Sequence, residues 1–290
     1  MWQHTRVSIR GWLLLACAGF GVTHLVGELF GTPLLPSAEL LAWVALAAYL
    51  AVAGRDAPLR VRLALGAGLV ILIVLPAGAL FSTVDSGGFG WVALSEAPRQ
   101  SALDVAAEAV REDAPVLIAY ACLALAALFL PKRRTRAGIA LAVVGIGVAV
   151  AYAAVEVWHR EGFPPVLAAV PPLLVAVLAF LVASRVSSWV LRAGLALLGL
   201  AAVALLGDVL DRVYLYPFYE PLDGGDAFLE PGFRYSTGNT AAPSLAATLD
   251  PPALGFALIP VIQLAAAAAI TAGCLHRPAT PPEPSEPAQA

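Results

Sequence analysis

Long apolar runs alternate with short polar stretches along almost the whole chain. A helix needs about 20 apolar residues to cross the hydrocarbon core of a bilayer, with a usual range of about 17–25. Eight runs reach or approach that length, near residues 11–30, 38–54, 62–82, 114–130, 137–158, 165–184, 189–213 and 253–275. The pattern predicts an all-α fold: a polytopic transmembrane helix bundle of about eight spans, forming a single domain over residues 1–276.

The basic residues orient this predicted bundle. The loop 131–136 holds four of the 17 basic residues between two apolar runs, and short basic loops of membrane proteins stay in the cytoplasm. With this loop inside and eight spans alternating, the remaining basic residues fall mostly on the same side, and both termini are expected in the cytoplasm. Only five fall on the outer side: Arg99, Arg111, Arg160, Arg212 and Arg234.

The first apolar run has a second interpretation. The stretch Leu14-Leu15-Ala16-Cys17 resembles the cleavage box of a lipoprotein signal peptide. Only residues 11–16 separate the preceding arginine from the cysteine, whereas the apolar core of a signal peptide has about 7–15 residues. We therefore expect the first run to be a true membrane helix.

Two of the predicted spans are irregular. The fourth, 114–130, is short, with Asp113 placed to cap it and Pro115 in its first turn. The sixth contains Pro171-Pro172, which removes two backbone donors and predicts a kinked or broken helix. Broken helices mark the binding site in some transporters, because the freed backbone groups must meet neighbouring helices or line a cavity.

Two long polar segments fall on the predicted outer side, at 83–113 and 214–252. In the first, apolar and acidic residues form two separate stripes over 103–112, which predicts a short amphipathic helix lying at the membrane interface. In the second, Tyr and Phe residues directly follow the seventh span, as in the aromatic belts of membrane proteins. The tail 277–290 is rich in Pro and Glu and is expected to be disordered.

The two halves of the chain show limited internal similarity. A shift of 126 residues aligns 67–69 with 193–195 and Asp85 with Asp211. The first three spans of each half then coincide, which is compatible with a duplicated unit of four helices, as in transporters built from parallel repeats. Ala, Leu, Gly and Val dominate both halves, so chance identities are also expected.

Composition agrees with a membrane protein. The chain is 60% apolar and 13% charged, with a mean hydropathy of +0.83, whereas soluble domains carry about 25% charged residues. The net charge of −3 and the lack of a basic surface argue against nucleic acid, and leave the lipid bilayer as the expected partner. Lys132 is the single lysine and alanine is abundant, a bias typical of high-GC bacterial genomes. We therefore expect the protein in the plasma membrane of a bacterium.

No motif of enzyme or cofactor chemistry stands in the sequence. Cys17, Cys122 and Cys274 lie inside apolar runs without CxxC spacing, which is typical of small residues that pack between helices. There is no phosphate-binding loop, nucleophile elbow or zinc-peptidase motif, and the four histidines are too scattered to predict haem or metal ligation. We predict no catalytic residue, metal or cofactor.

Ionisable side chains near the outer ends of odd-numbered spans are the candidates for function, because charged groups inside a membrane are costly. His24 and Glu28 are one turn apart in the first span, Glu156 and His159 share a stripe of the fifth, and Asp208 lies near the end of the seventh. Since the odd-numbered spans all run outward, their ends can meet. The hypothesis is an outward-facing polar pocket built by spans one, three, five and seven, which would bind a proton, a cation or a cationic substrate.

The alternative for these residues is ion pairing at helix ends, of Asp208 with Arg212 and of Glu156 with Arg160, at i, i+4 spacing. Three functions remain open: a small transporter or permease, a membrane enzyme acting on a lipid or isoprenoid at the outer leaflet, and a non-catalytic component of an envelope complex. The predicted broken helix and the repeat slightly favour transport. The scarcity of polar groups in the inner halves of the spans counts against it.

Overall fold

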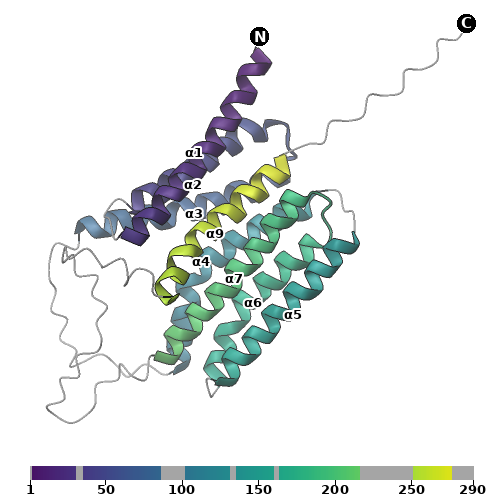
Figure 1. The fold of residues 1–290 in the computed structure, drawn as a ribbon. Helices are drawn as coiled ribbons and strands as arrows, with labels where there is room; N and C mark the ends of the chain where they lie inside the picture. The colour runs from purple at the N-terminus through teal and green to yellow at the C-terminus, as the bar shows by residue number, and fades with distance from the viewer. Residues whose placement is uncertain are drawn as a thin grey trace, which may run out of the picture.

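The computed structural model describes residues 2–30, 35–85, 102–130, 135–159, 163–215 and 251–275. Regular structure in these ranges is helical throughout, so the predicted all-α fold is confirmed (Figure 1). The helices are α1 Trp2–Phe30, α2 Leu35–Ala53, α3 Leu59–Asp85, α4 Ala102–Leu128, α5 Arg136–His159, α6 Phe163–Ala183, α7 Trp189–Leu215 and α9 Pro251–Leu275, with a 3₁₀ turn η1 at Gly54–Asp56.

Seven helices in the described ranges are long and apolar enough to cross a membrane: α1, α2, α3, α5, α6, α7 and α9. Their outward faces carry exposed apolar side chains such as Leu15, Leu63 and Val143, which suit contact with lipid tails better than with water. α4 differs because the charged run 111–113 precedes its apolar part. An eighth span in α4 and the cytoplasmic location of both termini stay predictions.

The helices form a bundle with α4, α7 and α9 at its centre. α4 contacts α3, α6, α7 and α9, and α7 also contacts α5, α6 and α9. α1 packs against α2 and α9, whereas α5 packs against α6 and α7. α1 and α5 therefore lie on opposite sides of the bundle, as Figure 1 shows.

Glycines let α5, α6 and α7 approach one another closely around a single aromatic ring. Phe180 of α6 is buried, and a Cβ atom at Gly145 of α5 would lie 2.5 Å from its ring. A Cβ atom at Gly199 of α7 would lie 2.7 Å from the same ring. The ring thus fills the space that two missing side chains leave, which is how small residues bring membrane helices together.

The described charged residues separate toward the two ends of the bundle. At one end, where α5 and α7 begin and α2, α6 and α9 end, most of them are basic; we call it the basic end. It carries Arg55, Arg60, Arg62, Arg136, Arg185 and Arg192. At the opposite end most are acidic, and we call it the acidic end. It carries Glu39, Asp104, Glu108, Glu112, Asp113, Glu156 and Asp208.

Two local predictions differ from the structure. The amphipathic segment 103–112 and the span 114–130 form one continuous helix, α4, so Asp113 and Pro115 lie inside it and do not begin it. The segment is thus the first part of α4 and not a separate helix at the interface. α6 also continues through Pro171-Pro172, so the predicted break is wrong: each proline removes only one backbone hydrogen bond, and the other hydrogen bonds of the helix remain. A kink at this pair stays a prediction.

Some predictions fall outside the described residues. These are the disordered tail 277–290, the loop 131–134 and most of the segment 214–252. The duplication of four helices is tested by none of the described contacts and stays a prediction.

Candidate functional site

His24 lies on the inward face of α1. It is 5% exposed, and it shares a buried stripe with Cys17 and Gly21. A Cβ atom at Gly21 would lie 2.6 Å from Leu264 of α9, so α1 packs closely on α9 just before His24. The imidazole is thus held within the bundle, as the stripe pattern predicts for an ionisable group in a span.

Glu156 and Asp208 lie on the neighbouring helices α5 and α7 at the acidic end. Both are half-buried. The Tyr152 hydroxyl, one turn before Glu156, would lie 2.6 Å from a Cβ atom at Gly207. Tyr152 therefore reaches across to the backbone of α7 beside Asp208, and these polar groups of α5 and α7 lie close together.

The structure divides the predicted pocket residues between two sides of the bundle. His24 belongs to α1 and to the side formed with α2 and α9, whereas Glu156 and Asp208 belong to the side formed by α5, α6 and α7. The side chains of Glu28 and His159 lie outside the described residues, although both positions are helical. Whether the five residues act together stays a hypothesis.

One acidic residue of the second span was not among the candidates. Trp43 of α2 is 1% exposed, and its indole nitrogen donates a hydrogen bond of 3.2 Å to Glu39 Oε1, one turn earlier. Glu39 is the second residue of the predicted span 38–54, and an acid within a span is the pattern that could have identified it. It adds a partly buried carboxylate to the side of the bundle that carries His24.

A second group that sequence reasoning overlooked lies on α4 in the middle of the bundle. Asp113 is 9% exposed and Tyr120 is fully buried. They are seven residues apart, with Leu117 buried between them, so the three form one inward stripe about 10 Å long. Burial depends on the helices around α4, so the hydropathy pattern alone did not reveal this stripe.

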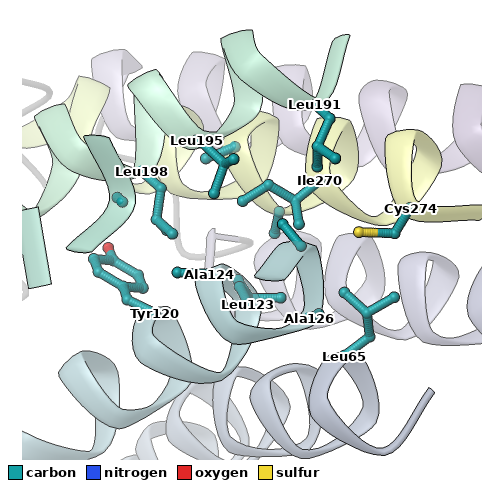
Figure 2. Close-up of a cluster of buried hydrophobic side chains, with 14 of the residues drawn as sticks. Leu65, Tyr120, Leu123, Ala124, Ala126, Leu191, Leu195, Leu198, Ile270 and Cys274 are labelled. Carbon is teal, nitrogen blue, oxygen red and sulfur yellow. The ribbon is translucent and has the colours of Figure 1, made fainter. Parts of the chain in front are cut away.

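Tyr120 has a polar neighbour on α9. The Gln263 amide lies beside the Tyr120 hydroxyl. The charge of Asp113, nearer the acidic end, also acts on this hydroxyl. Within the described part of the chain, the hydroxyl makes no hydrogen bond of standard geometry, so Tyr120 and Gln263 are adjacent but loosely aligned. Figure 2 shows Tyr120 at the margin of the apolar cluster that Leu123, Leu195 and Ile270 fill.

Thr271 carries a further polar group toward the basic end. It is fully buried on α9, eight residues after Gln263 and so about 12 Å further along the helix. Its hydroxyl also lacks a hydrogen-bond partner among the described residues. Asp113, the neighbouring pair Tyr120 and Gln263, and then Thr271 therefore place polar groups at three successive depths in a mostly apolar core.

The described helices bring together no three His, Cys, Asp or Glu side chains that could hold a metal ion. Cys17, Cys122 and Cys274 are free thiols on α1, α4 and α9. The polar groups described above are carboxylates, hydroxyls, an amide and an imidazole, and such groups can bind cations and exchange protons.

In comparison with known proteins, the chain matches no family model, no curated protein and no solved structure. The class of protein therefore follows from the fold itself. Seven apolar helices of spanning length with apolar side chains on their outer faces define a multi-pass membrane protein.

Proposed function

We propose that the protein moves protons or small cations across the membrane. The path would enter at the acidic end and run along Asp113, Tyr120 and Gln263 toward Thr271. The observation that carries the proposal is the buried stripe of α4, in which a carboxylic acid near the acidic end is followed by a phenol deeper in the bundle. Ionisable residues within membrane helices are costly, and they commonly line substrate or ion pathways.

The charge distribution favours the entry of cations at the acidic end. Glu108 and Glu112 are exposed on the first turns of α4. Asp208 lies on the adjoining helix α7, and Glu156 lies on α5, which belongs to the same apolar cluster at this end. A surface lined with one sign of charge raises the local concentration of the opposite ion. In this proposal Glu156 and Asp208 form the mouth of the path, and His24 belongs to a separate polar group on α1.

The depth of the polar groups decides whether they form a path through the bundle or only an entrance at its acidic end. Sequence reasoning found few polar groups in the inner halves of the spans, which counts against transport. Gln263 and Thr271 reduce that objection, because they extend the polar positions about 12 Å beyond Tyr120 toward the basic end. The near absence of lysine relative to arginine and the abundance of alanine support the plasma membrane of a bacterium as the site of this activity.

The test is ion flux into liposomes that contain the purified full chain. A diffusion potential would drive protons, Na⁺ or K⁺, and an entrapped dye specific for each ion would report flux. The Asp113→Asn variant should lower the flux about tenfold or more, which corresponds to about 1.4 kcal/mol of barrier. Glu108→Gln is the matched control, because Glu108 is exposed on the same helix. Tyr120→Phe should lower flux without changing charge.

Two results would overturn the proposal. One is wild-type flux equal to that of empty liposomes for all three ions. The other is equal flux in the wild type, Asp113→Asn and Tyr120→Phe, with both variants folded by size-exclusion chromatography and thermal unfolding. Equal loss in Asp113→Asn and Glu108→Gln would mean that surface charge, and not the buried stripe, governs the flux.

A further inference from the structure

A contact between three helix ends organises one corner of the basic end. Arg192, in the first turn of α7, donates hydrogen bonds from Nη2 to Thr135 Oγ1 at 2.7 Å and to the Val186 carbonyl at 2.9 Å. Thr135 directly precedes α5, and Val186 lies in the turn between α6 and α7. Arg192 thus ties the beginning of α5 to the end of α6.

This contact gathers positive charge. Arg136 follows Thr135 in the chain and is exposed, and Arg185 precedes Val186 and is half-buried. Arg136, Arg185 and Arg192 therefore all lie at the same corner of the bundle. Among the described residues, the basic end also carries the carboxylate Asp56. It lies on η1, between α2 and α3, and not on the helices that form this corner. The corner formed by α5, α6 and α7 keeps its positive charge.

The backbone adds to this charge. α5 and α7 both begin at the corner, and the N-terminus of a helix carries a partial positive charge on its free N–H groups. Thr135 Oγ1 accepts one of them, from Gly138 at 3.1 Å, and Ser188 Oγ accepts another, from Leu191 at 3.5 Å. The remaining N–H groups of both first turns face the same end of the bundle as the arginines.

Apolar side chains beside the corner place it at the level of lipid headgroups. Trp189, the first residue of α7, is 76% exposed, and exposed tryptophan is typical of the membrane interface. Ile139, in the first turn of α5, and Leu181, in the last turn of α6, are also exposed. Both lie slightly further from the basic end than Arg136 and Arg185 do. A ligand with an anionic head and apolar chains matches this combination.

We propose that the corner formed by Thr135, Arg136, Arg185, Trp189 and Arg192 binds the phosphate headgroup of an anionic phospholipid. The phosphate accepts hydrogen bonds from the guanidinium groups, and the acyl chains lie along Ile139 and Leu181. Basic sites between membrane helices recognise lipids in this way. The residues of this site are distinct from those of the proposed ion path, which begins at the opposite end of the bundle.

The test is native mass spectrometry of the full chain in detergent, titrated with dioleoylphosphatidylglycerol or dioleoylphosphatidylcholine. The wild type should retain the anionic lipid about tenfold better than the zwitterionic one. The double variant Arg136→Gln, Arg185→Gln should bind the anionic lipid about thirtyfold more weakly, the factor that two basic residues contribute near an anionic membrane surface. It leaves Arg192 and its two hydrogen bonds in place, so the corner stays folded.

The matched control is Arg55→Gln, Arg60→Gln, which removes the same charge from exposed positions at the same end, around η1 and the start of α3. It should keep wild-type lipid binding. Equal loss in the two double variants, or equal retention of both lipids by the wild type, would overturn the site. Displacement of the anionic lipid by an equal concentration of inorganic phosphate would overturn the lipid assignment, because it would show recognition of the free anion.

Discussion

The ring of Phe180 between two glycines offers a sharp test of how α5, α6 and α7 are held together. In the variant Gly145→Ala, the new methyl group would lie 2.5 Å from two ring atoms, whereas carbon atoms in contact are normally about 3.5–4.0 Å apart. The ring cannot move away freely, because Gly199 of α7 approaches it as well, with a Cβ position 2.7 Å from it. The helices must therefore separate by about 1 Å.

The magnitude follows from two opposing terms. Overpacking a well-packed core costs about 1–3 kcal/mol. Replacing glycine by alanine within a helix returns about 0.5–1 kcal/mol. The net destabilisation at Gly145 should be about 1–2 kcal/mol, which lowers the melting temperature by about 3–6 °C. Gly147, two residues further on α5, has nothing within 4 Å of its Cβ position, so Gly147→Ala should leave the melting temperature unchanged or raise it slightly.

The chain carries its own probes for this measurement. Cys17 and Cys274 are buried free thiols, so a thiol-reactive dye reports unfolding of the purified protein in detergent. A melting temperature of Gly145→Ala equal to or above that of Gly147→Ala would refute the reasoning. The double variant Gly145→Ala, Phe180→Leu replaces the ring by a smaller side chain. It should recover part of the lost melting temperature, because contacting residues are coupled.

Three further variants test the polar contacts. Gly207→Ala should displace the Tyr152 hydroxyl and lower the melting temperature by a few degrees; unchanged melting would contradict the contact. Arg192→Met should destabilise the fold by about 2–4 kcal/mol, because two hydrogen bonds from a charged donor are lost, and thermal unfolding measures this. Trp43→Phe removes the hydrogen bond to Glu39 and should cost about 1–3 kcal/mol; stability equal to the wild type would exclude a contribution from that bond.

Hydropathy located the helices well, because the length of an apolar run is a direct measure of what a bilayer can cover. The seventh span is predicted at 189–213 and observed at Trp189–Leu215. The prediction failed for the helix at 102–128, because Asp113 and Pro115 have the sequence pattern of a helix start. In the structure their surroundings in the bundle override that local preference and α4 runs through both residues.

The sequence predicted how far along its helix each candidate residue lies, but not which helices lie side by side in the membrane. Positions along a helix follow from residue number, so Glu156 and Asp208 are expected near one end of the bundle and are found there. Which helices adjoin depends on packing between surfaces that are all Ala-, Leu- and Val-rich. Sequence periodicity therefore did not show that α1 and α5 lie on opposite sides, or that Tyr120 faces Gln263.

The continuity of α4 has a mechanical consequence. Its 27 residues make a rod about 40 Å long, which exceeds the hydrocarbon core of about 30 Å. If its apolar end lies within the membrane, its first turns, with Asp104 and Glu108, project beyond the lipid. A tilt of that projecting part would also move Tyr120, because both belong to the same helix. Pro115, which lies between Glu108 and Tyr120, weakens the helix at that point. Binding events outside the membrane and the position of a phenol deep within it are thus joined by a single continuous helix.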